Sequence, residues 1–179
     1  MVVRGQPAPV TGGSWIVFRR KSAEDKFAAA FYLRVAEEAR RPRLFDACGI
    51  PDTLDGRFDA LALHAALAID RLRREPDGDR LAQAFFDVMF QHLDLTLREI
   101  GIQDLGVGRR IKIMAEGLHG RALAYREALA GGPTSLDEVL RRNAYGGTSP
   151  AEEPLGYLEE YVRGYAEALA KTPRNDLLK

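Results

Sequence analysis

The chain has 179 residues, 46% of them hydrophobic, which suits one globular domain with a buried core. Its 26 basic and 26 acidic side chains balance, and this excludes the lysine and arginine excess that broad, sequence-independent nucleic-acid binding needs. A single cysteine, Cys48, excludes an intrachain disulfide, and no apolar run approaches the roughly 20 residues of a membrane span. We therefore expect a soluble, cytoplasmic protein, with contact at a membrane surface left open.

The first 21 residues read as a flexible lead. They contain prolines, glycines and four basic side chains, but no acidic one. A basic arm of this kind could touch acidic lipid, and its short apolar stretch Trp15–Phe18 could dock on the body of the protein.

Two helices are expected next. Ser22, with Asp25 three residues later, is a capping signature for a helix that runs to about Arg40. A short helix over Arg43–Ala47 follows and is stopped by a glycine. Cys48 then reads as a small apolar residue at the end of this short helix.

The stretch Gly49–Arg74 predicts the central helix of the fold. After a proline turn, with either Asp52 or Asp55 as the N-terminal cap, the pattern is apolar almost all round. Between Phe58 and Ile69 only two polar residues interrupt it. A helix with so little polar surface must be surrounded by others.

Two long helices should follow, separated by a glycine-bearing connector at 101–108. The first spans Arg80–Ile100, is capped by Asp79, and is the natural antiparallel partner of the central helix. The second spans about Arg109–Ala130. The glycine spacing of the connector does not fit a phosphate-binding loop.

Two further helices complete the pattern. Thr134 or Ser135 caps a short one over Leu136–Ala144, and the signature at Ser149 starts a last helix that ends near Lys171. No segment alternates with period two. We predict an all-α, single-domain, irregular bundle of six to seven helices over 22–171, with a lead at 1–21 and a polar tail at 172–179.

Metal and cofactor signals are weak. The Glu-x-x-His pattern ending at His119 occurs once, whereas di-metal bundles need it twice. His64 and His92 face each other in the predicted packing, so they could ligate haem iron or zinc, or be core histidines bonded to a carbonyl or carboxylate. Candidate carboxylate partners are Asp59, Asp87 and Asp94. We expect no metal and no cofactor.

Basic side chains gather along the predicted helix at 109–130. Arg109, Arg110 and Lys112 lie close in sequence, and Arg121 and Arg126 follow further along. This pattern suits either a solvated helix face or contact with an acidic partner or phosphate surface.

Several short motifs, in order, resemble the ubiquinol-cytochrome c chaperone family. These motifs are Ile50-Pro51-Asp52-Thr53, Gly56-Arg57-Phe58-Asp59, Leu63-His64, Phe86-Asp87, Asp94-x-x-Leu97-Arg98-Glu99, Gly120-Arg121, Ala124-Tyr125-x-Glu127-Ala128-Leu129 and Tyr161-Val162-Arg163. The similarity covers about residues 35 to 170. The short, arginine- and alanine-rich chain is similar to bacterial members.

The resemblance implies a non-enzymatic assembly chaperone for the cytochrome bc1 complex that binds newly made cytochrome b. Family members work with a small partner protein, and a bacterial one would act in the cytoplasm or peripherally at the inner membrane. We expect Arg98, Arg109, Arg110, Lys112 and Arg121 to contact client or membrane, because long cations are readily left exposed. Structural roles are expected for Asp52 as a cap, Arg57 in an ion pair, His64 in the core and Tyr125 as a buried phenol.

Two other functions stay open on the sequence. One is a small-ligand or haem-binding bundle with a pocket near the two histidines. The other is a membrane-surface adaptor that uses the basic N-terminal arm.

Overall fold

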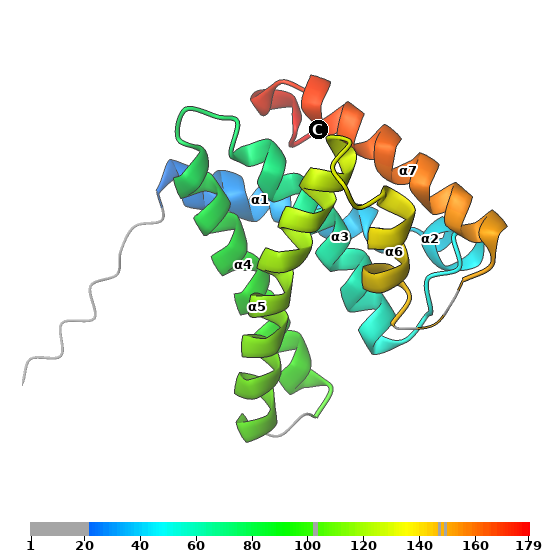
Figure 1. Cartoon of the computed structure of the whole chain (residues 1–179). Helices are drawn as coiled ribbons and strands as arrows, with labels where there is room; N and C mark the ends of the chain where they lie inside the picture. The colour runs from blue at the N-terminus through cyan, green and yellow to red at the C-terminus, as the bar shows by residue number, and fades with distance from the viewer. Residues whose placement is uncertain (1–21, 102–103, 147, 149) are drawn as a thin grey trace, which may run out of the picture.

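The computed structural model describes residues 22–101, 104–146, 148 and 150–179. Within these ranges the chain forms seven α-helices and a short 3-10 helix, with no strand, so the all-α prediction is confirmed (Figure 1). The N-terminal lead and its expected lipid contact lie outside the described residues.

The helices follow the predicted order. They are α1 (Ala23–Glu38), α2 (Pro42–Asp46), α3 (Leu54–Leu72), α4 (Gly78–Glu99), α5 (Asp104–Leu129), α6 (Leu136–Ala144), α7 (Glu152–Lys171) and the 3-10 helix η1 (Arg174–Asp176). The largest difference is in α5, which begins at Asp104 and so absorbs much of the stretch expected to be a connector. Its early glycines cost some helix stability, which tertiary contacts along α5 outweigh.

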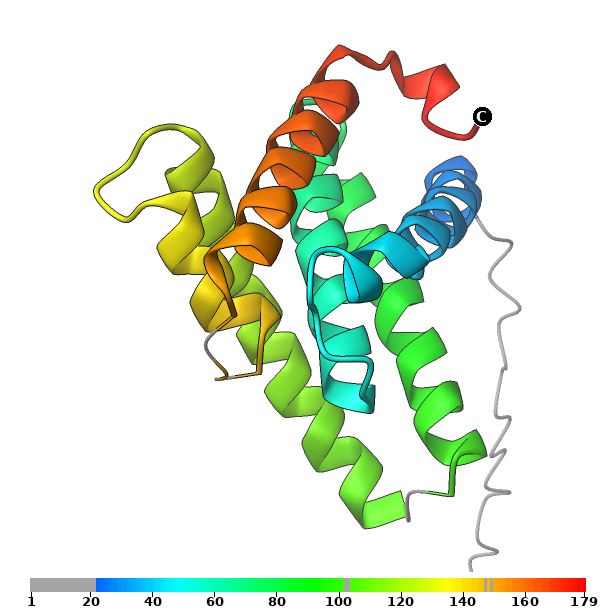
Figure 2. The same cartoon turned by 90° about the vertical axis from the view of Figure 1, so that its right-hand side faces the viewer.

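Helix α3 is the centre of the bundle, as predicted. It packs against α1, α4, α5, α6 and α7, and Figure 2 shows α1 and α7 on either side of it. Most of its alanines and leucines are buried, and they lie on nearly every side of the helix. Since each large apolar side chain contributes about 1.5–3 kcal/mol when fully buried, α3 is a major source of the stability of the fold.

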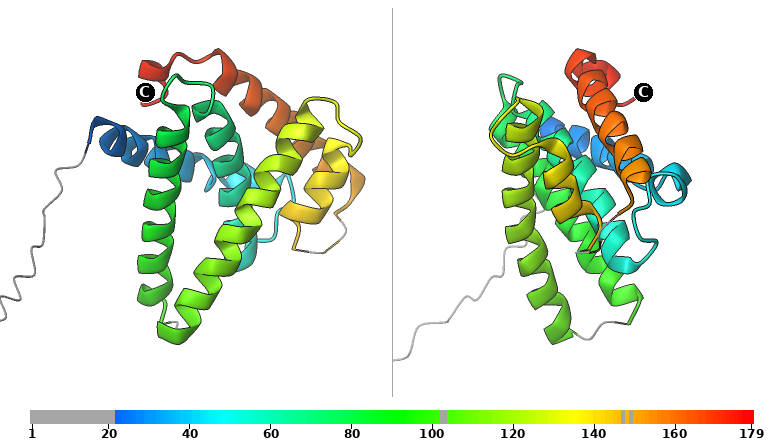
Figure 3. Two further views of the ribbon diagram at one scale, coloured as in Figure 1. Left: turned by 60° about the vertical axis from the view of Figure 1, so that its left-hand side comes forward. Right: turned by 45° about the vertical axis from the view of Figure 1, so that its right-hand side comes forward.

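Helix α4 has a different principal partner from the one expected. It does lie beside α3, but its most extensive packing is on α1, while α3 packs most on α5. Aromatic rings explain the α1–α4 contact, because the ring of Phe85 lies 5.8 Å from Phe31 and 5.9 Å from Tyr32. Helices α4 and α5 meet at their far ends in a hairpin that extends beyond the body of the molecule (Figure 3).

The helix caps were predicted with mixed success. Ser22 and Asp25 form the expected capping box. At α3, however, the Thr53 hydroxyl accepts the cap bond from the N–H of Gly56, so neither aspartate is the cap. Helix α4 starts two residues early, after Asp77.

The last two helices also show how close cap candidates compete. Ser135 is the N-cap residue of α6, but its side chain makes no cap bond. Helix α7 follows Ala151, two residues after the cap position that was predicted at Ser149. Ser149 itself lies outside the described residues.

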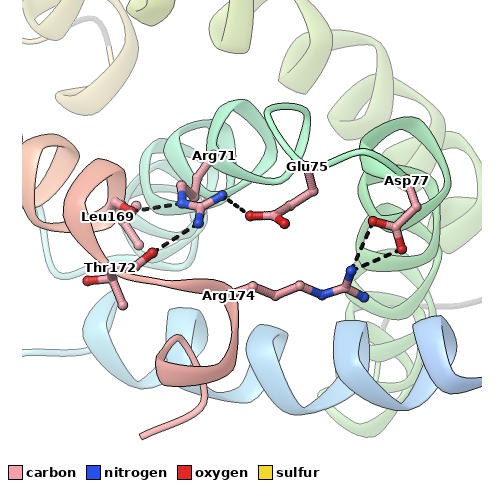
Figure 4. Close-up of polar contacts among 6 residues, drawn as sticks. All are labelled: Arg71, Glu75, Asp77, Leu169, Thr172 and Arg174. Atoms are coloured by element: carbon pink, nitrogen blue, oxygen red, sulfur yellow. Dashed lines mark hydrogen bonds and ion pairs between the residues drawn. The ribbon is translucent and has the colours of Figure 1, made fainter.

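The end of α7 is tied to α3 by one buried arginine. Arg71 donates to the carbonyl oxygens of Leu169 and Thr172, each at 2.9 Å, and to the Glu75 carboxylate at 2.6 Å (Figure 4). A buried guanidinium is tolerated because its bonds replace those that it would make to water.

The residues after α7 fold back over the bundle. Arg174 donates to both carboxylate oxygens of Asp77, at 2.9 and 3.1 Å, and lies over the ring of Phe27 (Figure 4). Leu177 is buried, and Arg34 of α1 donates to the carbonyl oxygen of Lys179. Residues 172–179 therefore pack on α1 and on the α3–α4 turn.

Cys48 is enclosed behind the short helix α2. Its side chain is completely buried, and burial raises the pKa of its thiol. The Tyr145 hydroxyl, at the end of α6, donates to the Cys48 carbonyl oxygen at 2.9 Å. This bond links the end of α6 to the turn that follows α2. The environment is that of a structural cysteine, as the sequence indicated.

Candidate functional site

The surface is hollowed where the α4–α5 hairpin leaves the body. One hollow of about 440 Å³ lies between α1, α2, the start of α3 and the second half of α4. A second, of about 680 Å³, lies between the start of α3 and the first half of α5. Phe58 and Met114 line both hollows, so we treat the two as one front groove.

The lining of the front groove is mostly apolar and also carries charged residues of both signs. Its large apolar residues are Tyr32, Phe45, Leu54, Phe58, Leu61, Leu93, Leu97, Ile113 and Met114. Its charged residues are Arg40, Asp46, Asp52, Asp55, Arg57, Asp59, Arg109, Arg110 and Arg121. A surface of this composition suits a protein segment that has an apolar face.

Two of these apolar side chains are left open to solvent. Leu54 on α3 is 43% exposed and lines the first hollow, and Ile113 on α5 is 59% exposed and lines the second. An isolated exposed leucine would be ordinary, but these two face a groove whose floor is also apolar. The arrangement indicates a docking surface.

The sequence of α5 explains why cations reach the groove. Residues at 106, 109, 110, 113, 117 and 121 recur at three- and four-residue spacing and line one hollow. The buried side chains of Leu118 and Tyr125 are directed elsewhere on the same helix. Helix α5 therefore presents Arg109, Arg110 and Arg121 to the groove.

Arg121 is anchored beneath the groove. Its guanidinium lies 2.7 Å from the buried carboxylate of Asp59 and 5.5 Å from the centre of the Phe58 ring. Burial raises the pKa of Asp59, and the charge of Arg121 opposes that rise. Because the pair is largely enclosed, it holds α3 against α5 and fixes the groove floor.

The remaining arginines of the groove differ in whether they have an ion-pair partner. Arg110 pairs with the exposed carboxylate of Asp55. Arg109 on one side and Arg40 on the other make no ion pair with any residue that the structure describes. Exposed, unpaired guanidinium groups at two edges of an apolar surface favour a partner with acidic residues beside its apolar face.

Two of the expected contact residues lie apart from the groove lining. Arg98, on α4, donates to Asp94 at 2.7 Å. Lys112, on α5, is exposed and lies 3.9 Å from Glu116. The structure thus brings three of the five predicted cations together and leaves two on the outer surface of the hairpin.

The residues expected to be structural occupy the groove edge and the core. Arg57 donates to both oxygens of Asp52, at 2.5 and 3.1 Å, and lies over the ring of Phe45 at the groove edge. Asp52 thus serves as an ion-pair partner while Thr53 caps the helix. Tyr125 is buried, which raises its pKa, and its hydroxyl finds no hydrogen-bond partner among the described residues.

The two candidate histidines do not form a pair, and only His64 lies in the core, since His92 is half-buried and lines the groove. Nδ1 of His64 lies 2.7 Å from the carbonyl oxygen of Ala60, and its Nε2 lies 2.7 Å from the Tyr161 hydroxyl. His92 instead contacts the Tyr32 hydroxyl through Nδ1, at 2.7 Å. The expected carbonyl partner is therefore present for His64, whereas the carboxylate partners predicted for the two histidines were wrong.

His64 is held neutral by its surroundings. Complete burial lowers its pKa to about 4, more than the hydrogen bond to Ala60 raises it. The three candidate carboxylates are engaged elsewhere, Asp59 with Arg121, Asp87 with Gln83 and Asp94 with Arg98. Both ring nitrogens of His64 are occupied, so the residue acts as a core hydrogen-bonding group.

Within the described ranges, no three histidine, cysteine, aspartate or glutamate side chains are grouped to hold a metal ion. None of the helices described is both long and apolar enough to span a bilayer.

Sequence reasoning missed several groove residues. Leu54 sits in the first helical turn, where its exposure depends on how α2 approaches. Ile113 could have been recognised from the sequence, because it is apolar but does not belong to the positions of α5 that were expected to face the core. Arg40 could not be linked to the groove without knowing that α1 lies beside α4.

Comparison with known proteins agrees with this architecture. The sequence pattern of the ubiquinol-cytochrome C chaperone family matches residues 46–179. The chain belongs to this family. The match includes α3, α4 and α5, which build most of the front groove, so the resemblance expected from the sequence motifs is confirmed.

Two relatives are informative. The chain is 24% identical over 152 residues to the ubiquinol-cytochrome-c reductase complex assembly factor 1 of Xenopus laevis, covering 84% of this chain and 76% of that protein. The crystal structure of the Cbp3 homolog from Brucella abortus matches with a TM-score of 0.73 and 34% identity, over 90% of both chains. The family and the fold are thus supported independently.

Proposed function

We propose that the protein is a non-enzymatic assembly chaperone of the cytochrome bc1 complex that holds newly made cytochrome b in the front groove. Membership of the ubiquinol-cytochrome C chaperone family supports the assembly role. So does the name of the Xenopus laevis relative, an assembly factor of ubiquinol-cytochrome-c reductase. The protein would then work in the cytoplasm and meet the inner membrane as a peripheral partner of its client.

The observation that carries the client site is the pair of exposed apolar side chains, one in each hollow of the front groove. Leu54 and Ile113 remain open to solvent above an apolar floor that includes Phe58 and Met114. Covering a large apolar side chain contributes up to about 1.5–3 kcal/mol, before the entropic cost of association. A few such anchors give reversible binding, which a chaperone needs in order to release its client.

The charges at the groove edges favour one kind of client segment. Arg109 and Arg40 lack acidic partners in the described part of the chain, and the Arg110–Asp55 pair is exposed enough to exchange partners. A segment with an apolar face flanked by carboxylates would satisfy both features.

The test replaces the two exposed anchors in the full chain. A Leu54→Asp, Ile113→Asp double variant, expressed in a strain that lacks the native protein, should reduce co-purified cytochrome b at least tenfold and lower the amount of assembled bc1 complex. Leu33→Asp is the matched control, because Leu33 is 64% exposed on α1 but does not line the groove.

The readouts separate the two parts of the proposal. Unchanged co-purification in the double variant would move the client site elsewhere and leave the assembly role intact. Normal bc1 levels in a strain without the protein would remove the assembly role itself. An equal loss in the Leu33 variant would mean that general surface polarity, and not the groove, matters.

A further inference from the structure

The side of α5 that faces away from the front groove borders a second recess. A hollow of about 370 Å³ lies among α3, α4 and α5, and another of about 400 Å³ lies among α3, α5 and α7. Ala122 lines both, so they form one continuous feature, which we call the back trough.

The back trough has the length of a short helix. Its wall on α5 runs from Ala115 to Ala130, which corresponds to about 22 Å at the rise of an α-helix. Alanines line it on facing sides, at Ala122 on α5, Ala66 on α3 and Ala166 on α7. Small side chains on several walls let the backbone of an additional helix approach closely.

Arginines dominate the charge of the trough. Arg73 at the end of α3 and Arg126 near the end of α5 are exposed and form no ion pair with any described residue. Arg74 also lines the trough and pairs only with Asp70, through an exposed contact that contributes little. The acidic lining residues are Asp70 and Asp79. Unpaired guanidinium groups in both hollows call for carboxylates on whatever lies there.

We propose that the back trough binds an acidic amphipathic helix of a second protein while the front groove holds the client. The apolar face of that helix would pack on the alanines and on Leu129 and Leu169, and its glutamates or aspartates would reach Arg73 and Arg126. Because α5 separates the two surfaces, both can be occupied at once. The inference that both surfaces are occupied at once rests on the proposed client site. The inference that the trough binds a helix does not depend on it.

The direct test uses a designed peptide of about 15 residues, the helix length that fits the trough. One face carries alanine and leucine, and the flanking positions carry glutamate; a matched peptide has lysine in their place. Fluorescence anisotropy with the full chain should show binding of the glutamate peptide only. An Arg73→Glu, Arg126→Glu double variant should weaken that binding at least tenfold.

Arg109→Glu is the matched control, because Arg109 is also exposed and unpaired in the described part of α5 but faces the front groove. It should leave peptide affinity within twofold. Equal binding of both peptides, no binding of the glutamate peptide, or equal weakening by Arg109→Glu would overturn the proposal. Circular dichroism of each variant confirms that the fold is retained.

A cellular readout separates this inference from the client site. Cells with the Arg73→Glu, Arg126→Glu variant should assemble at least threefold less bc1 complex, while cytochrome b still co-purifies with the protein. Loss of cytochrome b together with the complex would show that the trough is no separate site. Normal assembly would show that a second partner is not needed there.

Discussion

Residues between α3 and α7 differ from those around the front groove in their burial and in their bonding partners. Near α7, Arg71 and His64 are buried and make hydrogen bonds to two or more groups each. Around the groove, Arg109 is exposed and unpaired in the described chain, and Ile113 is open to water. Arg71 and His64 have their interactions satisfied internally, so they hold the fold, whereas Arg109 and Ile113 keep interactions available for another molecule.

The largest effect should come from the buried arginine. Arg71→Ala would leave the carbonyl oxygens of Leu169 and Thr172 and the carboxylate of Glu75 without their donor. We expect a loss of about 3–5 kcal/mol in the free energy of unfolding, measured by urea denaturation. Arg74→Ala is the control, with an expected loss below about 1 kcal/mol, since its pair with Asp70 is exposed.

If the two arginine variants lost equal stability, the assignment of Arg71 as a residue that holds the fold would be wrong. A small loss at Arg71 would mean that water replaces its bonds readily. The comparison between the regions would then rest on packing alone.

The next effect is a pH dependence that originates at His64. Its pKa in the folded chain is about 4, against an ordinary value of 6.5, so the unfolded chain binds an extra proton between these values. The contribution of neutral His64 to the free energy of unfolding is therefore complete above pH 6.5. It falls as the pH drops toward 4, by up to about 3 kcal/mol.

Denaturation of the native chain and a His64→Gln variant at several pH values would isolate this contribution. The variant should be less stable at pH 7 but should lose less stability on acidification. Parallel stability curves for the two proteins would show that His64 is not held neutral. Titration of the carboxylates cancels in the difference between the two curves.

A smaller effect contrasts two glycines in the helices that form the groove, of which Gly56 is tightly enclosed and Gly117 is open. At Gly56 a Cβ atom would overlap the carbonyl oxygen of Pro51, so Gly56→Ala should cost about 1–3 kcal/mol of unfolding free energy. At Gly117, which lines the groove, a Cβ would meet nothing within 4 Å. Gly117→Ala should stabilise α5 by about 0.5–1 kcal/mol, because alanine is the better helix former.

Thermal unfolding of both variants measures the contrast directly. Opposite signs are expected. A stabilising Gly56→Ala would mean that the turn before α3 shifts easily, and the wall of the groove would then be less rigid than the contacts indicate.

The smallest effect on stability belongs to the groove anchors. Leu54→Asp and Ile113→Asp should each change the unfolding free energy by no more than about 0.5 kcal/mol, because both side chains are already exposed. The same variants are expected to lose the client. A large loss of stability in either would mean that the residue holds the fold.

Much of the fold could be read from the sequence because its signals are local and repeated. The apolar α3 pattern and the Ser22 capping box each depend on residues near one another in the chain. The start of α5 was missed because its glycines resemble a connector, while contacts with α3 and α4 keep it helical. The cap of α3 was missed because Thr53 and two aspartates compete within four residues.

The site could be predicted only in part, for a physical reason. The sequence grouped Arg109, Arg110 and Arg121 with Lys112 along one predicted helix, and the structure brings the three arginines, but not Lys112, to one hollow. Which side chains face them depends on contacts between residues far apart in sequence, such as Asp59 with Arg121. Those contacts come from packing, and no local pattern encodes them.

The enclosed thiol of Cys48 has a practical use. It is fully covered and its pKa is raised, so a maleimide dye at neutral pH would leave it unmodified while reacting with an exposed thiol. Since the chain has no second cysteine, a single Ile113→Cys or Ala122→Cys substitution would carry one label at a known position. Either fluorophore would then report occupancy of its own face in real time, without removing the native cysteine.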